Sequence, residues 1–213
     1  MGGGWYRFIR WVATQIFRLT GGIRSVGSEN VPPHGPTLLA PIHLSFLDPP
    51  AVACGTRRQL RFMAKEELFR IPLLKSLILS LGAFPVKRGE GDTESIRRTL
   101  ALLEAGEAVL IFPEGTRGDG EVLQPINRGV TMLAKRTGAQ VVPVAIVGSN
   151  VVLPKHGKRR RCRITLAYGV PFRYTDTAVQ ADEKLNRDAF AERLSRELVA
   201  LANANGSAIR IAG

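Results

Sequence analysis

The sequence has 213 residues, of which 45% are hydrophobic and 23% are charged, and its formal net charge at pH 7 is +12. This length and composition predict one globular domain with a substantial core, and they exclude collagen-like, low-complexity and disulfide-rich chains. The excess of positive charge favours an anionic partner, which is a nucleic acid, an anionic membrane surface or a phosphorylated substrate. The two cysteines, Cys54 and Cys162, match no metal-binding or disulfide spacing, so a reducing, cytosolic setting fits best.

Residues 1–22 are typical of an amphipathic helix that ends at two glycines. Apolar side chains recur at helical spacing, and arginines form a second stripe on the opposite side. The aromatic surface exceeds what one core-facing stripe needs, which suits the interface of an anionic bilayer. Packing of the helix on the protein's own core is equally consistent with the pattern. The candidate membrane-binding residues are Trp5, Arg7, Phe8, Arg10 and Trp11.

The location predicted from this segment is peripheral, on the cytoplasmic face of the cell membrane. Its arginines interrupt the apolar residues, and no small-residue cleavage pattern follows, which argues against a signal peptide. The longest uncharged runs are broken by proline, glycine, asparagine and serine, so we interpret them as buried strands and loops.

The rest of the chain, residues 23–213, alternates predicted strands with predicted helices and forms the second region of the chain. Strands are expected at 23–26, 37–42, 60–64, 82–89, 108–112, 140–147 and 163–168, and helices at 49–54, 66–81, 93–105, 128–136 and 182–203. This alternation predicts an α/β fold, in which a single domain contains a largely buried mixed sheet flanked by helices.

A histidine and an aspartate bracket the connection between a buried strand and the next helix. His43 lies at the end of the strand, and Asp48, followed by Pro49, is expected to cap the helix. The short connection predicts that the imidazole and the carboxylate come within hydrogen-bond reach. A carboxylate on one ring nitrogen fixes the tautomer and leaves the other nitrogen free to accept a proton. The pair is therefore a candidate general base, although helix capping alone also explains Asp48.

Two further strand ends carry polar residues that suit a phosphate. Ligands collect at strand ends in α/β sheets, so we expect these residues to form one site with His43. Cations and the backbone amides of a glycine-bearing turn are what a phosphate monoester requires. The alternative is a solvated strand end and a local ion pair. The candidate phosphate-binding residues are Lys87, Arg88, Glu114, Gly115, Thr116 and Arg117.

Four blocks of residues resemble the glycerolipid acyltransferases, the family that includes lysophosphatidate acyltransferase. Two details differ from the commonest pattern: Gly118 stands where a serine often follows the arginine, and residues 85–87 are a variant of the second block. The matching residues are His43 with Asp48; Gly82, Phe84 and Arg88; the run from Phe112 to Arg117; and Pro143.

The resemblance implies that an acyl group moves from a thioester, either acyl-CoA or acyl-carrier protein, to the free hydroxyl of lysophosphatidic acid, forming phosphatidic acid in phospholipid biosynthesis. It implies that His43 is the general base, that Asp48 orients it, and that Arg88 and residues 114–117 hold the acceptor. Glycerol 3-phosphate or another lysophospholipid is the alternative acceptor. We expect no metal and no cofactor beyond the thioester, which is already activated, and the three histidines are scattered.

Two alternatives concern the chemistry and the class of protein. Neither Ser45 nor Cys54 lies in a nucleophile-elbow sequence, so we expect direct transfer rather than an acyl-enzyme. The basic run at 155–163 is the best argument for a non-catalytic protein that binds anionic lipid or nucleic acid. No recognised nucleic-acid motif accompanies it, so we expect this run to contact an anionic membrane and expect no nucleic-acid partner.

Overall fold

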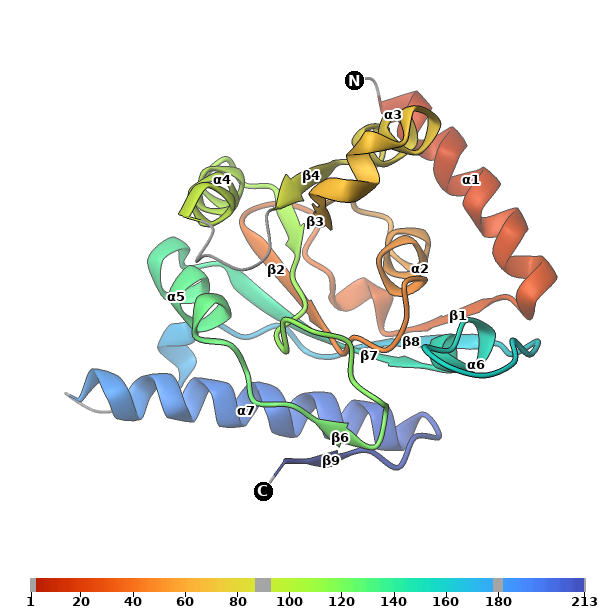
Figure 1. The fold of residues 1–213 in the computed structure, drawn as a ribbon. Helices are drawn as coiled ribbons and strands as arrows, with labels where there is room; N and C mark the ends of the chain where they lie inside the picture. The colour runs from red at the N-terminus through yellow and green to blue at the C-terminus, as the bar shows by residue number, and fades with distance from the viewer. Residues whose placement is uncertain (1–2, 87–92, 178–181, 213) are drawn as a thin grey trace.

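A mixed sheet forms the centre of the computed structural model, which describes residues 3–86, 93–177 and 182–212 (Figure 1). In these residues seven strands lie in the order β1, β8, β7, β2, β5, β3, β4. Neighbouring strands run parallel, except that β7 and β8 are antiparallel. The mixed sheet predicted from the sequence is confirmed. The strands are β1 Ile23–Val26, β2 Thr37–Pro41, β3 Leu60–Lys65, β4 Ala83–Val86, β5 Ala108–Leu110, β7 Gln140–Val147 and β8 Ile164–Tyr168.

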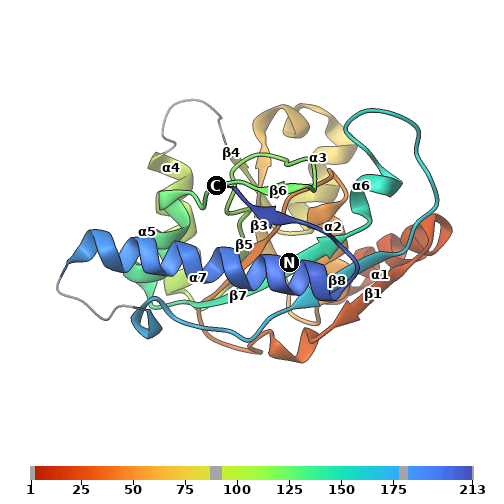
Figure 2. The same cartoon turned by 90° about the horizontal axis from the view of Figure 1, so that it is seen from below.

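Helices cover both faces of this sheet (Figures 1 and 2). Side chains of β2 show the two layers, because Leu38 and Ala40 belong to one buried cluster and Leu39 to the other, as the two-residue period of a strand requires. One face carries α1 Gly3–Thr20, α2 Asp48–Gly55 and α3 Pro72–Ser80, and the other carries α4 Thr93–Glu104, α5 Arg128–Thr137 and α7 Glu183–Ala204. Shorter helical elements are η1 Ser28–Asn30, η2 Glu66–Arg70, α6 Ser149–Val152 and η3 Tyr174–Asp176.

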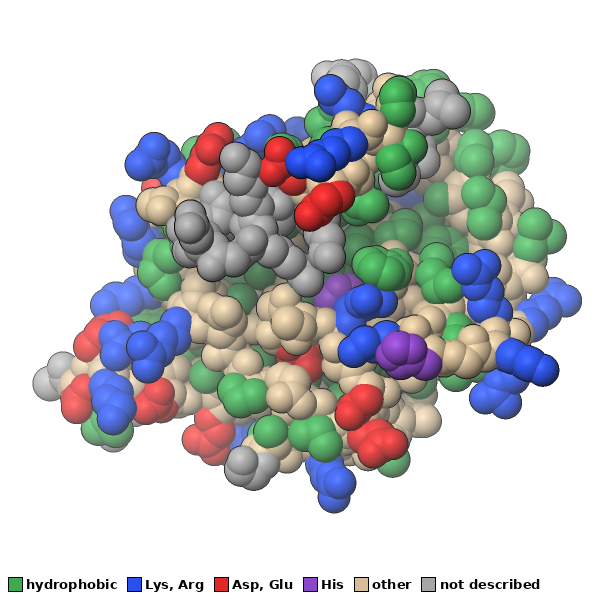
Figure 3. Space-filling model, in the orientation of Figure 1, with side chains coloured by type: hydrophobic (Ala, Val, Ile, Leu, Met, Phe, Trp, Pro, Cys, Tyr) green, Lys and Arg blue, Asp and Glu red, His purple; other side chains and the backbone are tan. Residues whose placement is uncertain are grey.

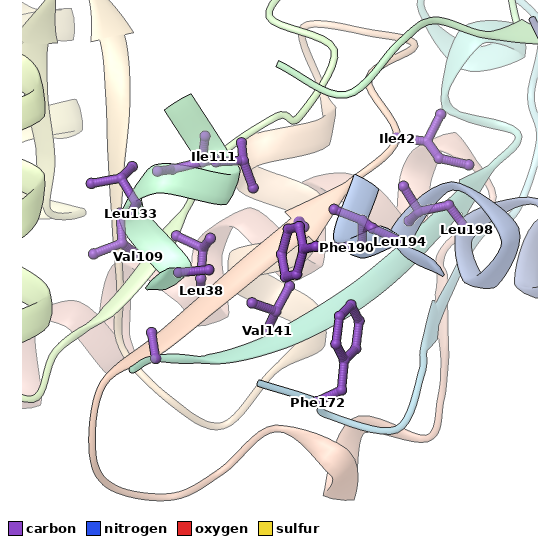
Figure 4. Close-up of a cluster of buried hydrophobic side chains, with 14 of the residues drawn as sticks. Leu38, Ile42, Val109, Ile111, Leu133, Val141, Phe172, Phe190, Leu194 and Leu198 are labelled. Carbon is purple, nitrogen blue, oxygen red and sulfur yellow. The ribbon is translucent and has the colours of Figure 1, made fainter. Parts of the chain in front are cut away.

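The larger cluster is packed beneath α7, which lies across β7 (Figures 2 and 4). Phe190 of α7 is fully buried, and its ring centroid lies 5.5 Å from that of Phe172. Leu194 and Leu198 continue the same face of the helix toward β7. Full burial of such side chains contributes about 1.5–3 kcal/mol each, so this layer holds β2, β5 and β7 in fixed positions.

Some short elements have no counterpart in the sequence-based prediction. Strands β6 Val122–Leu123 and β9 Arg210–Ile211 pair in parallel, and α6 is a single turn. Two residues are too few for an alternating pattern, and one turn is too short for helical periodicity. These elements depend on contacts between distant segments, which local patterns do not contain.

Helix α1 lies on the body of the protein with its apolar stripe turned outward. Tyr6 and Phe17 are buried against the neighbouring elements, whereas Trp5, Phe8 and Leu19 are exposed. The helix therefore does pack on the protein, as the alternative proposed, but through Tyr6 and Phe17 rather than through most of the apolar stripe. No helix in the described ranges combines the length and the apolar character needed to cross a membrane.

Candidate active site

His43 and Asp48 meet just beyond the carboxyl end of β2. Nδ1 of His43 lies 2.9 Å from Oδ2 of Asp48, which confirms the expected contact. The same oxygen accepts hydrogen bonds from the backbone amides of Leu44 at 2.6 Å and Ser45 at 2.7 Å. Because a carboxylate only accepts, this network assigns the proton to Nδ1. Within the described part of the chain, no hydrogen bond involves Nε2, so this nitrogen is free to accept a proton.

Asp48 does not cap α2, which corrects the prediction made from its sequence. Leu47 occupies the N-cap position without a side-chain hydrogen bond, and Asp48 is the first residue of the helix. Its carboxylate, which is fully buried, turns back to the connection after β2. There it satisfies two backbone amides beyond the end of the strand, and such buried donors are costly to leave unpaired. The position of Asp48 at the start of α2 therefore lets its carboxylate hold both the connection after β2 and the imidazole of His43.

The segment that follows β5 holds His43 from three sides. The ring of Phe112 stacks on the imidazole, with centroids 3.7 Å apart and planes 21° apart. Oε1 of Glu114 accepts a hydrogen bond from the backbone amide of His43 at 3.1 Å, and the amide of Gly118 donates to the carbonyl of His43 at 2.8 Å. Because β2 and β5 are neighbours in the sheet, their ends supply both halves of this site. The imidazole is therefore fixed in place.

Glu114 faces the backbone with both oxygens, since Oε2 accepts from the amide of Gln124 at 3.1 Å. Burial raises the pKa of this carboxyl, and the hydrogen bonds from Gln124 and His43 oppose that rise. This geometry is that of a residue that positions His43 and the following loop. Direct contact of Glu114 with a phosphate stays a prediction.

The other candidate phosphate-binding residues lie beside this pair or outside the description. Gly115 has φ +70°, and its amide donates to the carbonyl of Phe112, which makes the turn tight. Thr116 is exposed, and the guanidinium of Arg117 lies 3.7 Å from the centre of the Phe46 ring, next to the His43 connection. The remaining candidates, Lys87 and Arg88, lie outside the described residues.

Neither Ser45 nor Cys54 is arranged as a nucleophile beside His43. Ser45 is fully buried, and its hydroxyl donates to the carbonyl of Leu153 at 2.9 Å. Cys54 lies near the far end of α2 and directs its thiol at the carbonyl of Arg10. Burial raises the pKa of Cys54, which favours the unreactive thiol form.

Sequence patterns did not identify two contacts of this site. These are the stacking of Phe112 on the His43 ring and the hydrogen bond from the Gly118 amide to the His43 carbonyl. Both contacts join segments about 70 residues apart in the sequence, as the hydrogen bond between His43 and Glu114 does. Phe112 and Gly118 flank the turn that the sequence singled out, so adjacency to that turn was the available signal. The pairing of β2 with β5 is what converts that adjacency into contact.

Comparisons with known proteins match between about three fifths and nearly all of the chain. Residues 22–147 match a family model described as Acyltransferase. The 1-acyl-sn-glycerol-3-phosphate acyltransferase of Bacillus subtilis is 32% identical over 202 residues, which are 93% of this chain and 97% of that protein. The lyso-ornithine lipid O-acyltransferase of Pseudomonas aeruginosa is 34% identical over 137 residues, which are 64% of this chain and 51% of that protein. The crystal structure of the 1-acyl-sn-glycerophosphate (LPA) acyltransferase from Thermotoga maritima matches with a TM-score of 0.77 and 25% identity, covering 94% of this chain and 80% of that one.

Proposed function

Since this chain belongs to the acyltransferase family and is an O-acyltransferase, we propose that it transfers a fatty acyl group from a thioester to the free hydroxyl of lysophosphatidic acid, forming phosphatidic acid. The observation that carries the proposal is the buried His43–Asp48 pair, whose Nδ1 contact leaves Nε2 available. The names of the Bacillus subtilis and Thermotoga maritima proteins support this acceptor.

His43 acts as the general base in the proposed reaction. The acceptor hydroxyl gives its proton to Nε2 while its oxygen forms a bond to the thioester carbonyl carbon. Asp48 stabilises the imidazolium that results, through the 2.9 Å contact with Nδ1. The tetrahedral intermediate then collapses, the carbon–sulfur bond breaks, and the departing thiolate takes the proton from Nε2. The products are the ester and the free thiol, and the imidazole is neutral again.

Transfer is direct, without an acyl-enzyme. Burial and the hydrogen bond to Leu153 occupy the hydroxyl of Ser45, and Cys54 is separated from His43 by the length of α2. A thioester is already activated, so a base, positioning and oxyanion donors suffice, and the reaction needs no metal or other cofactor.

The phosphate of the acceptor binds at the segment after β5, together with the segment after β4. Gly115, Thr116 and Arg117 lie next to the connection that bears His43, as the contact of Arg117 with Phe46 indicates. Arginine suits a phosphate because its planar donors match two oxygens at once. We expect Lys87 and Arg88, which lie outside the described residues, to supply further cations to the phosphate, and Glu114 orders the segment after β5 through its bonds to His43 and Gln124.

A second candidate for the acceptor is another lysolipid or glycerol 3-phosphate. The match to a lyso-ornithine lipid O-acyltransferase supports this alternative, because the same pair and sheet would then serve a different head group. Acyl-CoA and acyl-carrier protein are both compatible with the proposed chemistry, which uses only the thioester.

The test is acyl transfer by the purified protein in anionic micelles, from oleoyl-CoA to lysophosphatidic acid. His43→Ala is expected to lower kcat by a factor on the order of a hundred to ten thousand, because general base catalysis contributes that much. His34→Ala, at an exposed histidine outside the site, is the matched control. In parallel reactions, glycerol 3-phosphate replaces lysophosphatidic acid as the acceptor, and oleoyl-acyl-carrier protein replaces oleoyl-CoA as the donor. Equal rates for His43→Ala and wild type would refute the assigned base.

Helix α1 and the basic segment 155–163 support a peripheral position on the cytoplasmic leaflet. Phe8 lies between Trp5 and Trp11, with ring centroids 5.7 and 6.3 Å away, and all three rings are exposed. Arg7 is also exposed, whereas Arg10 turns inward and donates to the carbonyl of Thr56. Figure 3 shows hydrophobic side chains over α1 and α3, with lysine and arginine side chains nearby. Exposed aromatic rings with adjacent cations suit the interface of an anionic bilayer.

Vesicle binding tests this orientation separately from catalysis. The double variant Trp5→Ser/Phe8→Ser is expected to bind phosphatidylglycerol vesicles about tenfold or more weakly, because it removes apolar area from the interface. Val170→Ser, at a residue that is 70% exposed in the loop after β8, is the control. Unchanged binding of the double variant in a co-sedimentation assay would reject α1 as the contact.

A further inference from the structure

A groove lined by four arginines lies between α1 and the segment that follows α2. Arg7, Arg10 and Arg18 come from α1, Arg57 comes from the other side, and the cavity has a volume of about 380 Å³. Asp48 begins α2, whereas Gly55 at its other end lines the groove. An eight-residue helix is about 12 Å long, so this groove is separate from the site around His43.

The positive charge of this groove is not neutralised by protein carboxylates. None of its four arginines forms an ion pair with a described residue. Arg10 donates to the carbonyl of Thr56 at 2.6 Å and Arg18 donates to Oε1 of Gln15 at 2.7 Å, and both acceptors are uncharged. Like charges gathered in one concavity raise the local potential and attract an anion. Ser28 adds a hydroxyl to the lining, whereas the hydroxyl of Thr14, also in the lining, donates to the carbonyl of Arg10 at 2.8 Å.

We propose that this groove binds the phosphate of an anionic lipid head group, at a site distinct from the acceptor site near His43. Guanidinium groups bind phosphate oxygens in pairs, and hydroxyl and amide groups supply further donors. The ligand of the groove is therefore a phosphate group. Its source is either a lipid head group or a soluble phosphate.

The position of α1 favours the lipid as the source of the phosphate. The helix presents Phe8 and Ile16 outward, while Arg10 and Thr14 line the groove behind them. With the exposed rings in the apolar part of the interface, the arginines on the opposite, polar side of the same helix face the head-group layer and the water beyond it. Trp11 joins the two surfaces, because it is 60% exposed, lines the groove and contacts the ring of Phe8. The choice of lipid therefore rests on the proposed membrane contact of α1, and the phosphate site itself does not rest on acyl transfer.

Trp11 provides a local signal for testing this site. The chain has two tryptophans, so Trp5→Phe leaves Trp11 as the single tryptophan, which is excited selectively over the three tyrosines at about 295 nm or above. We expect dihexanoyl phosphatidic acid, below its micellar concentration, to change Trp11 emission with saturation. Arg57→Gln is expected to raise Kd about tenfold, the effect of one charged hydrogen bond. Arg136→Gln, which removes the same charge at an exposed position on α5, is expected to leave Kd unchanged.

The other arms separate the sources of phosphate and the two proposed functions. Inorganic phosphate and dihexanoyl phosphatidylcholine are titrated in the same way, and both are expected to bind at least tenfold more weakly. His43→Ala in the Trp5→Phe background is expected to keep the Trp11 response, so a failure of the catalytic proposal does not affect this result. Equal Kd for inorganic phosphate would overturn the lipid as the source. No saturable response, or equal effects of Arg57→Gln and Arg136→Gln, would overturn the site.

Discussion

The two ends of β2 and β5 carry polar networks of different design, one half-buried and the other buried. At the amino ends, the guanidinium of Arg58 donates to the carbonyls of Pro32, Gly35 and Gly106 and to the hydroxyl of Thr37, at 2.6 to 2.8 Å. At the carboxyl ends, the network gathers around the imidazole of His43.

The difference between the two networks lies in what each leaves unpaired. The terminal nitrogens of Arg58 donate to carbonyls in the loops before β2 and β5. Burial lowers the pKa of Arg58, and the charge of Glu107 opposes that change. At the other end, Oδ1 of Asp48 is buried without a hydrogen-bond partner among the described residues, and Nε2 of His43 accepts none. A network that joins neighbouring loops stabilises the sheet, whereas one with a free nitrogen at a strand end can perform chemistry.

The largest effect is expected from Asp48→Asn, which changes the network at the carboxyl ends of β2 and β5. The amide oxygen can keep the three donors that Oδ2 accepts, with the NH2 group at the position of the unpaired Oδ1, so the substitution removes the negative charge rather than these contacts. A neutral amide no longer stabilises the imidazolium that forms during transfer, and kcat is expected to fall by a factor on the order of a hundred to ten thousand. The measurement is the steady-state rate of ester formation, with Asp188→Asn at an exposed position on α7 as the control. Retention of a rate within threefold of wild type would show that Asp48 only supports the fold.

A smaller effect, on stability rather than on kcat, is expected at the amino end. Arg58→Ala leaves three half-buried carbonyls without this donor and should lower the free energy of unfolding by about 1–3 kcal/mol. Urea unfolding measures this change, and kcat per folded molecule should stay close to that of wild type. Arg57→Ala, one residue earlier and exposed, is expected to change stability by less than about 0.5 kcal/mol. The distinction between the two ends fails if Arg58→Ala lowers kcat as much as Asp48→Asn does.

These two networks also differ in how far the sequence predicts them. His43 and Asp48 are five residues apart, so a strand end followed by a helix start was enough to expect their contact. Arg58 finds its partners 21 to 48 residues away, and their convergence depends on the strand order of the sheet. No local pattern contains that order. For the same reason the sequence predicted the amphipathic character of α1 but left open which side meets the protein, a choice made by Tyr6, Phe17 and the neighbouring elements.

The smallest expected effect concerns the pH dependence of stability at Glu114. Its pKa is raised by burial, so between the ordinary carboxyl range and the raised value the folded chain binds this proton more tightly than the unfolded chain does. The contribution of Glu114 to the free energy of unfolding therefore falls as pH rises through that window and becomes constant above it. Urea unfolding of wild type and Glu114→Gln across the acidic range measures the contribution as the difference between the two proteins. A difference that grows with rising pH through this window would mean that the hydrogen bonds from His43 and Gln124 outweigh burial, and that Glu114 is stabilised as the carboxylate.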